Sequence, residues 1–190
     1  MFNRRQLVCL VVCLATGIGS SMSAHATTAS VPTSSRHSQH ILTVSGGRAG
    51  DAFGSAVAIS KGVAVVGAPN RTVNGHPGQG AAYVFVKPSS GTWRDARLAT
   101  VLTVGQGQAG DAFGLAVTVA GNTIAVAAPL VTSGSYKHEG AVYLFEKPSG
   151  GWSNIHHPTA RLSPSDPAAG DLFGSSLASQ ADTIVVGSPG

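Results

Sequence analysis

A five-residue motif returns twice along this 190-residue chain, at a constant interval of 60 residues. Gly-Asp-Ala-Phe-Gly at 50–54 is repeated at 110–114, and Gly-Asp-Leu-Phe-Gly follows at 170–174. A fixed period of this length is typical of a chain built from one supersecondary unit that buries its faces only by stacking on its neighbours. The sequence therefore predicts a repeat region over residues 41–190, with units that begin near 50, 110 and 170.

Within one unit the pattern is that of short strands. Residues 53–59 alternate large and small side chains, 63–66 and 83–86 are β-rich runs bounded by Gly, Pro and Asn, and a fourth run covers 98–104. Gly and β-branched residues interrupt every candidate helix beyond the N-terminal segment. We predict an all-β fold of four-stranded antiparallel sheets that stack or radiate. The recurrent aromatic residues are then expected in the core between neighbouring sheets: Phe53, Tyr83, Phe113, Tyr143 and Phe173.

A second motif follows each Phe-Gly pair. Phe53-Gly54 precedes Gly67-Ala68-Pro69, Phe113-Gly114 precedes Ala127-Ala128-Pro129, and Phe173-Gly174 precedes Gly187-Ser188-Pro189. The paired motif resembles the FG-GAP repeat of the integrin α propeller and of many bacterial exported proteins. The resemblance implies propeller-type blades, here about two and a half units of an incomplete β-propeller. It also implies recognition or adhesion rather than catalysis, and it identifies no ligand.

The N-terminus has the features of a secretory signal peptide. Arg4 and Arg5 precede an apolar run over 7–18, and Ala24-His25-Ala26 has the small-x-small form, so we predict a signal peptide over residues 1–26. The run is about 12 residues long, against the roughly 20 that a membrane-spanning helix needs. We therefore expect a secreted, periplasmic or cell-surface protein with no stable membrane span after cleavage. Both cysteines would be removed, and residues 27–40 would form a Ser/His-rich lead-in.

Charge gives no argument for nucleic-acid binding. The whole chain has a net charge of +4, and loss of Arg4 and Arg5 leaves ten basic against eight acidic residues, a net charge of about +2. Binding to nucleic acid needs basic residues gathered on one face, and no such cluster is visible in the sequence. We expect a protein or glycan ligand instead.

The tight links inside the units do not suit a metal ion. Calcium needs 6–8 oxygen ligands, and several acidic or amide side chains at alternate positions of one loop usually supply them. The corresponding links at 60–62, 120–122 and 180–182 contain a single carboxylate, that of Asp182. We expect no metal site and no cofactor.

Asp51, Asp111 and Asp171 are the only acidic residues that recur in register. They could form a ring of carboxylates for a cation or a sugar, or each could cap the backbone of its own turn. Capping is favoured, because equivalent positions lie one blade apart and do not converge on one substrate. The histidines considered as catalytic candidates are His37, His40, His76, His138, His156 and His157. None of them belongs to a zinc-protease, hydrolase or phosphate-loop motif. We therefore predict no catalytic residue and no enzyme.

The better binding candidates are exposed loops and aromatic side chains. Loops 70–79 and 130–139 are the variable segments of the units, and Tyr136 lies in the second. Trp93 and Trp152 could stack on a ligand, although their near-repeat spacing favours structural packing. We predict an exported, non-enzymatic repeat module for protein or glycan interaction, adhesion-like in role. The alternative is an accessory, non-catalytic domain of a larger exported hydrolase.

Counting units gives one more expectation. Closed propellers have about 4–8 blades, and four units of this length would need about 240 residues. The third unit also stops before the Tyr-x-Phe strand found at 83–85 and 143–145. We therefore expect a partial product, or a chain that self-associates through its incomplete sheets.

Overall fold

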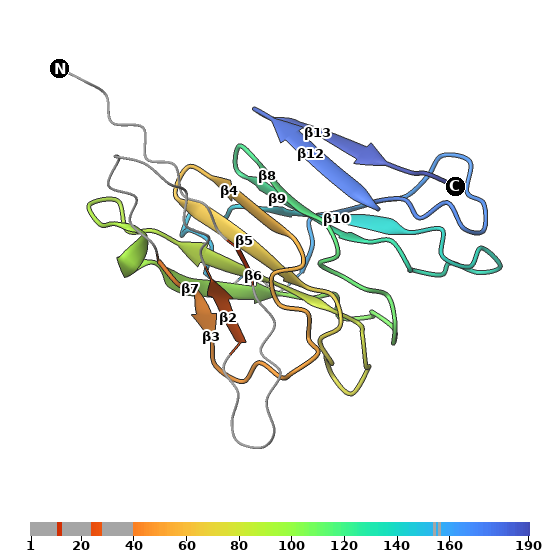
Figure 1. The fold of residues 1–190 in the computed structure, drawn as a ribbon. Helices are drawn as coiled ribbons and strands as arrows, with labels where there is room; N and C mark the ends of the chain where they lie inside the picture. Colours follow the sequence, from red (N-terminus) through yellow and green to blue (C-terminus); the bar gives the residue numbers. More distant parts are fainter. Residues whose placement is uncertain (1–10, 13–23, 28–39, 154, 156) are drawn as a thin grey trace, which may run out of the picture.

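The computed structural model describes residues 11–12, 24–27, 40–153, 155 and 157–190. They form an all-β fold of thirteen strands, β1 to β13, arranged as antiparallel sheets that follow one another in space (Figure 1). One 3-10 helix, η1 (Trp93–Asp95), interrupts the pattern. Within these ranges, no helix has the length and apolar character needed to cross a membrane.

Blade 1 is the four-stranded sheet of the first unit, in the order β4-β5-β6-β7. Consecutive strands pair antiparallel, so the sheet is a meander, and a register shift between Val84 and Phe85 bends the pairing of β6 with β7. The β-branched residues of the central strands supply the pairing surfaces that the sequence predicted. The strands are β4 (Val57–Ser60), β5 (Val63–Ala68), β6 (Ala81–Val86) and β7 (Arg97–Leu102).

Blade 2 repeats this sheet, and a third sheet begins in the same way. Tyr143 pairs with Val126 as Tyr83 pairs with Val66, so the register is preserved across the 60-residue interval. The four-stranded antiparallel units predicted from the sequence are confirmed. The remaining strands are β8 (Val117–Ala120), β9 (Thr123–Ala128), β10 (Ala141–Glu146) and β11 (Ala160–Leu162) in blade 2, and β12 (Ser176–Gln180) and β13 (Thr183–Gly187) in the third sheet.

One local prediction was wrong. The expected strand over 53–59 begins only at Val57, because Ala52 and Gly54 have φ angles of 56° and 91° and therefore form a turn. The Gly54 amide donates to the Gly67 carbonyl at 2.7 Å, which holds this turn against β5. No α-helix forms among the described residues, as the sequence predicted; the one helical segment there is the short 3-10 turn η1, which a reciprocal capping box between Thr92 and Asp95 closes.

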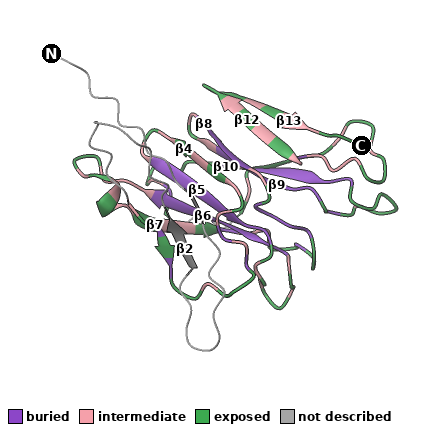
Figure 2. Ribbon diagram, viewed as in Figure 1, coloured by how far each residue is buried: buried purple, intermediate pink, exposed green. Residues whose placement is uncertain are grey.

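The main core lies between blades 1 and 2. Val65 and Val84 of blade 1 and Val126 of blade 2 are fully buried within one cluster, which also holds Phe113 at 1% exposure. The Phe113 ring lies 5.8 Å from that of Tyr143, centroid to centroid. Figure 2 shows this burial concentrated along β5, β6, β9 and β10, whereas β12 and β13 are intermediate or exposed. Phe113 is thus the inter-sheet anchor that the repeat pattern predicted.

Backbone hydrogen bonds also join successive blades. Gly80 forms a parallel bridge with Phe113, and Gly140 forms the equivalent bridge with Phe173. Gly80 has a φ of 90°, and a Cβ there would collide with the Phe113 carbonyl oxygen. Only glycine therefore fits at this point of the long loop.

A three-stranded sheet precedes blade 1, in the order β1 (Val11–Val12), β2 (Ala24–Thr27) and β3 (Thr43–Val44). Leu42 and Val44 are buried in the cluster that contains Val66 and Tyr83. Signal-peptide cleavage after Ala26 remains a prediction. It would remove β1 and the first three residues of β2.

Candidate functional site

Each blade has two unlike ends. The β4–β5 link is a tight turn, whereas the β5–β6 link is the loop 70–79, which leaves the blade at the end where the turn 50–54 lies. Blade 2 repeats this arrangement with loop 130–139 and turn 110–114. We call this surface of loops and turns the long-loop end. It gathers the segments that vary most between units.

The long loops share the same pair of backbone hydrogen bonds in both units. Val73 and His76 exchange amide–carbonyl hydrogen bonds of 3.2 and 2.9 Å, and Ser133 and Tyr136 repeat them at 3.2 and 3.0 Å. The side chains on this shared scaffold differ. The loops are thus ordered platforms for variable chemistry, which is the property that binding loops need.

The recurrent aspartates close turns, as the capping interpretation predicted. The carboxylate of Asp51 accepts from the Arg48 amide at 2.9 Å. Asp111 accepts from the Gln108 amide at 2.6 Å, and Asp171 accepts from the Ala168 amide at 2.7 Å. In each unit the acceptor lies three residues after the donor, so the carboxylate stabilises the segment that leads into the turn.

Asp51 has a further side-chain partner, which Asp111 and Asp171 lack among the described residues. Arg71 Nη1 lies 3.4 Å from Asp51 Oδ2, and the Arg71 guanidinium lies 5.5 Å from the centroid of the Tyr83 ring. Burial raises the pKa of Tyr83, and the charge of Arg71 opposes that shift. Arg71 is therefore held in place at the long-loop end by a carboxylate and an aromatic face.

A polar cavity of about 380 Å³ opens beside this pair. Sequence reasoning did not single out either of its two arginines. In unit 2, Gln108 stands in place of Arg48 and Val131 in place of Arg71, so the repeat fold does not require the arginines. We name the space the arginine cavity, and its lining is Gly46, Arg48, Asp51, Arg71, Thr72 and Gly75.

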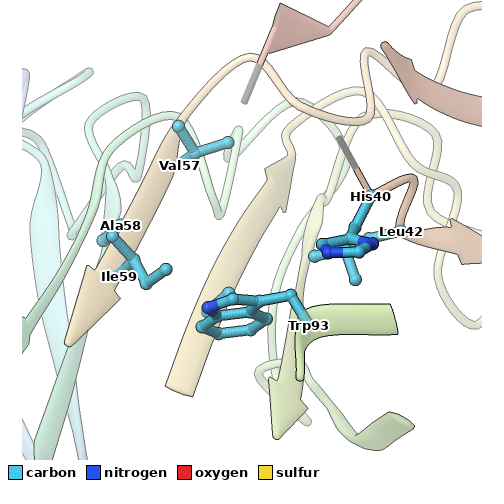
Figure 3. Close-up of a pocket in the computed structure, with 7 residues that line it drawn as sticks. His40, Leu42, Val57, Ala58, Ile59 and Trp93 are labelled. Atoms are coloured by element: carbon cyan, nitrogen blue, oxygen red, sulfur yellow. The ribbon is translucent and has the colours of Figure 1, made fainter. Parts of the chain in front are cut away.

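The three aromatic candidates have different surroundings. Trp152 is 4% exposed and packs in the core between the blades, as the structural interpretation predicted. Tyr136 is 42% exposed on its loop. Trp93 is half-buried and, with Leu42, faces Ile59 of β4 across an apolar cavity of about 140 Å³ (Figure 3).

This apolar cavity lies on a blade surface that is covered in the next unit. Val57 and Ile59 are 43% and 54% exposed, whereas their equivalents Val117 and Val119 are each 7% exposed because they pack against blade 1. The cavity thus marks the face of blade 1 that is equivalent to the inter-blade face of blade 2.

The part of the chain that the structure describes contains no cluster of potential metal ligands. There, no three His, Cys, Asp or Glu side chains group closely enough to hold an ion. His76 and His138 lie in the long loops, His40 lines the apolar cavity, and His37 and His156 lie outside the described residues. The absence of a metal or cofactor stays a prediction.

Asp111 supplies a test of turn electrostatics. Burial raises the pKa of its carboxyl above the ordinary value of 3.8, although the Gln108 amide opposes the shift. The folded state therefore favours the protonated Asp111 carboxyl. The stability that this preference contributes is fully present below the ordinary pKa of 3.8, and it is lost as the pH rises through the raised pKa of the folded state. We expect Asp111→Asn, which keeps an acceptor oxygen, to gain stability relative to the parent as the pH rises through this window.

Urea unfolding of both proteins at several pH values between about 3 and 7 measures this difference. Asp171→Asn is the matched control, because the same turn in the third unit is less buried. A difference between parent and Asp111→Asn that does not change with pH would contradict the assignment.

Two four-stranded sheets in series, followed by a two-stranded sheet in the same register, define a repeat protein of the propeller-blade type. The family model for the FG-GAP repeat matches residues 37–85, 98–145 and 157–190. The chain belongs to the FG-GAP repeat family. A search of curated proteins gives no match.

Proposed function

We propose that this chain is an exported, non-enzymatic module that binds a protein or glycan ligand through its long-loop end, in an adhesion-like role. One observation carries the proposal. Loops 70–79 and 130–139 share a hydrogen-bonded backbone but not their side chains, so Arg71 and His76 of the first correspond to Val131 and Tyr136 of the second. A shared scaffold with divergent side chains suits recognition rather than folding.

A binding role without catalysis is supported by how the acidic groups are used. The three recurrent aspartates accept hydrogen bonds from their own turns. Glu139 is 3% exposed and forms an ion pair of 3.0 Å with Arg161. These carboxylates are therefore committed to structure, whereas a general acid or base needs access to its substrate. Export is supported by the charged and apolar pattern over residues 1–26.

An exchange of side chains between the two loops tests the proposal. In the variant Arg71→Val/Tyr136→His, the first loop receives the valine found at the equivalent position of the second loop, and the second loop receives the histidine found in the first. The hydrogen-bonded backbone of both loops is kept. We expect it to lose ligands that the parent captures on peptide and glycan arrays, by about tenfold or more in apparent affinity. The protein is the full chain, recovered after export.

Arg97→Ala is the matched control, because Arg97 is exposed at the start of β7, at the end of the blade opposite to the long loops. It should bind as the parent does. Equal binding by the parent and the loop-exchange variant, or no captured ligand on either array, would contradict a ligand-binding long-loop end.

A further inference from the structure

The Gly-Asp-x-Phe-Gly turn binds main-chain carbonyls in two of the three units. In both, the amides at the first, third and fourth positions of the turn donate to three consecutive carbonyls of the preceding long loop. The turn is therefore a backbone receptor for an extended peptide segment. The bonds are Gly110 to Pro77, Ala112 to Gly78 and Phe113 to Gln79 at 2.9, 3.0 and 2.8 Å, and Gly170 to Lys137, Leu172 to His138 and Phe173 to Glu139 at 2.9, 3.1 and 2.8 Å.

The first turn has the same shape but an open receptor. Gly50 and Ala52 have φ angles of 92° and 56°, against 84° and 58° at Gly110 and Ala112. Among the described residues, no carbonyl accepts from the amides of Gly50, Ala52 or Phe53. Phe53 is buried and Ala52 is half-buried. Amide donors at such positions are expected to have acceptors, so a peptide segment that supplies carbonyls complements this turn.

The arginine cavity adjoins the open turn and adds a charge requirement. Arg48, Arg71 and a single carboxylate, that of Asp51, line the cavity, and the carboxylate already accepts from the Arg48 amide and from Arg71 Nη1. A guanidinium carries five N–H donors, so most of them are left for a ligand. Carboxylates are their strongest partners, through charge-assisted and often bidentate hydrogen bonds.

We propose that the first turn and the arginine cavity together bind an extended peptide segment that carries an acidic side chain. Three consecutive carbonyls of the segment accept from Gly50, Ala52 and Phe53, and its carboxylate pairs with Arg48 and Arg71. A glycan lacks the row of main-chain carbonyls that this receptor binds in the other two units. The inference names the ligand class for one part of the long-loop end, and so rests on the proposed function.

The internal contact also places the acidic residue of the ligand. His76 directly precedes Pro77, whose carbonyl accepts from the amide of Gly110, the residue next to Asp111. The equivalent ligand residue therefore precedes the one whose carbonyl accepts from Gly50, and Gly50 is next to Asp51, which lines the cavity with Arg48 and Arg71. The matching probe is the blocked peptide Glu-Pro-Gly-Gln-Gly, which copies residues 76–80 except for an acid in the first place. Gln-Pro-Gly-Gln-Gly is its neutral control.

Amide NMR spectra of the full chain, titrated with each peptide, test the proposal. With the acidic peptide, we expect saturable shifts of the Gly50, Ala52 and Phe53 amides, while the occupied amides of Gly110 and Ala112 stay in place. The neutral peptide should bind at least about tenfold more weakly. Higher salt should weaken the binding of the acidic peptide in particular.

Two variants take their residues from unit 2: Arg48→Gln and Arg71→Val. Each should weaken the acidic peptide about tenfold, and Arg97→Ala should leave its affinity unchanged. If Arg71→Val disturbs amides throughout the spectrum, then Arg48→Gln decides, because the Arg48 side chain is exposed.

Several outcomes would overturn the inference. These are the absence of shifts at the first turn, equal binding of the acidic and neutral peptides, and the same shifts with a glucuronate oligosaccharide, which would assign the site to a glycan. The amide shifts report this site alone. If the NMR titration shows no peptide binding at the first turn but the loop-exchange variant loses its array ligands, then the proposed peptide site is refuted and the proposed ligand-binding function still holds.

Discussion

Replacing Gly80 with alanine should lower the free energy of unfolding by about 3 kcal/mol or more. The residue has a φ of 90°, which costs an L-residue about 1–2 kcal/mol. Its new Cβ would also collide with the backbone of Phe113 in the next blade. Phe113 cannot move aside cheaply, because it is 1% exposed and its amide donates to Gln79 at 2.8 Å.

Two other glycines separate these costs. Gly75 has a φ of 84°, and a Cβ added there would have no neighbouring atom within 4 Å, so Gly75→Ala should carry the backbone cost alone, about 1 kcal/mol. Gly67 does not have a positive φ, but a Cβ there would collide with the Gly114 carbonyl. Gly67→Ala should therefore carry only the cost of pushing the blades apart.

Urea unfolding followed by Trp93 and Trp152 fluorescence gives the three free energies. The order of loss should be Gly75→Ala smallest and Gly80→Ala largest. A Gly75→Ala variant as unstable as Gly80→Ala would show that local backbone strain, and not close approach of the blades, demands glycine at the inter-blade contact.

Arg161→Val should lower the free energy of unfolding by about 2–3 kcal/mol, because it leaves a buried carboxylate without its cation. The Glu139 side chain is 4% exposed, and its Oε1 lies 3.0 Å from Arg161 Nη2. The Arg161 side chain is 37% exposed. The loss therefore comes mainly from stranding Glu139, not from desolvating the arginine.

In unit 1, neutral residues occupy the positions equivalent to the ion pair. Gln79 stands in place of Glu139, Val101 in place of Arg161, and Gln79 Nε2 donates to the Val104 carbonyl at 2.6 Å. Pro164 replaces Val104 in unit 2 and still offers a carbonyl. The double variant Glu139→Gln/Arg161→Val should therefore return to within about 1 kcal/mol of the parent.

A double-mutant cycle with Glu139→Gln as the other single variant measures the coupling between the two side chains. We expect the double variant to be more stable than Arg161→Val alone. If the two are equally unstable, the ion pair holds blade 2 in a way that the neutral arrangement of unit 1 cannot replace.

The strands were predictable because their signal is local and repeated. Val63 to Val66 and Tyr83 to Val86 are β-rich runs between turn residues, and the structure places them in β5 and β6. Residues 53–56 were misassigned, since their alternation resembles a strand. Their turn depends on the bond between Gly54 and Gly67, which are distant in sequence and meet only when the sheet forms.

The candidate site was predictable only in part. Loops 70–79 and 130–139 were identified from their variability, but the arginine cavity was missed. Its signal was present as a departure from the repeat: Arg48 and Arg71 occupy positions that are Gln108 and Val131 one unit later. That departure becomes a site only because folding brings segments 46–51 and 71–75 to one cavity.

The sequence by itself determined the period, the strand content and the family, because these depend on residue patterns within a unit that recur at equal spacing. Only the tertiary structure decided which equivalent residues differ in exposure. Trp93 and Trp152 follow similar turns, yet Trp152 is buried by the blade beside it while Trp93 lines an open cavity. The same applies to the turn amides: those of Gly110, Ala112 and Phe113 donate to the preceding long loop, whereas those of Gly50, Ala52 and Phe53 have no carbonyl acceptor in the described part of the chain. The physical reason is that burial and hydrogen bonding depend on the neighbouring blade, and a pattern within one unit carries no information about that neighbour.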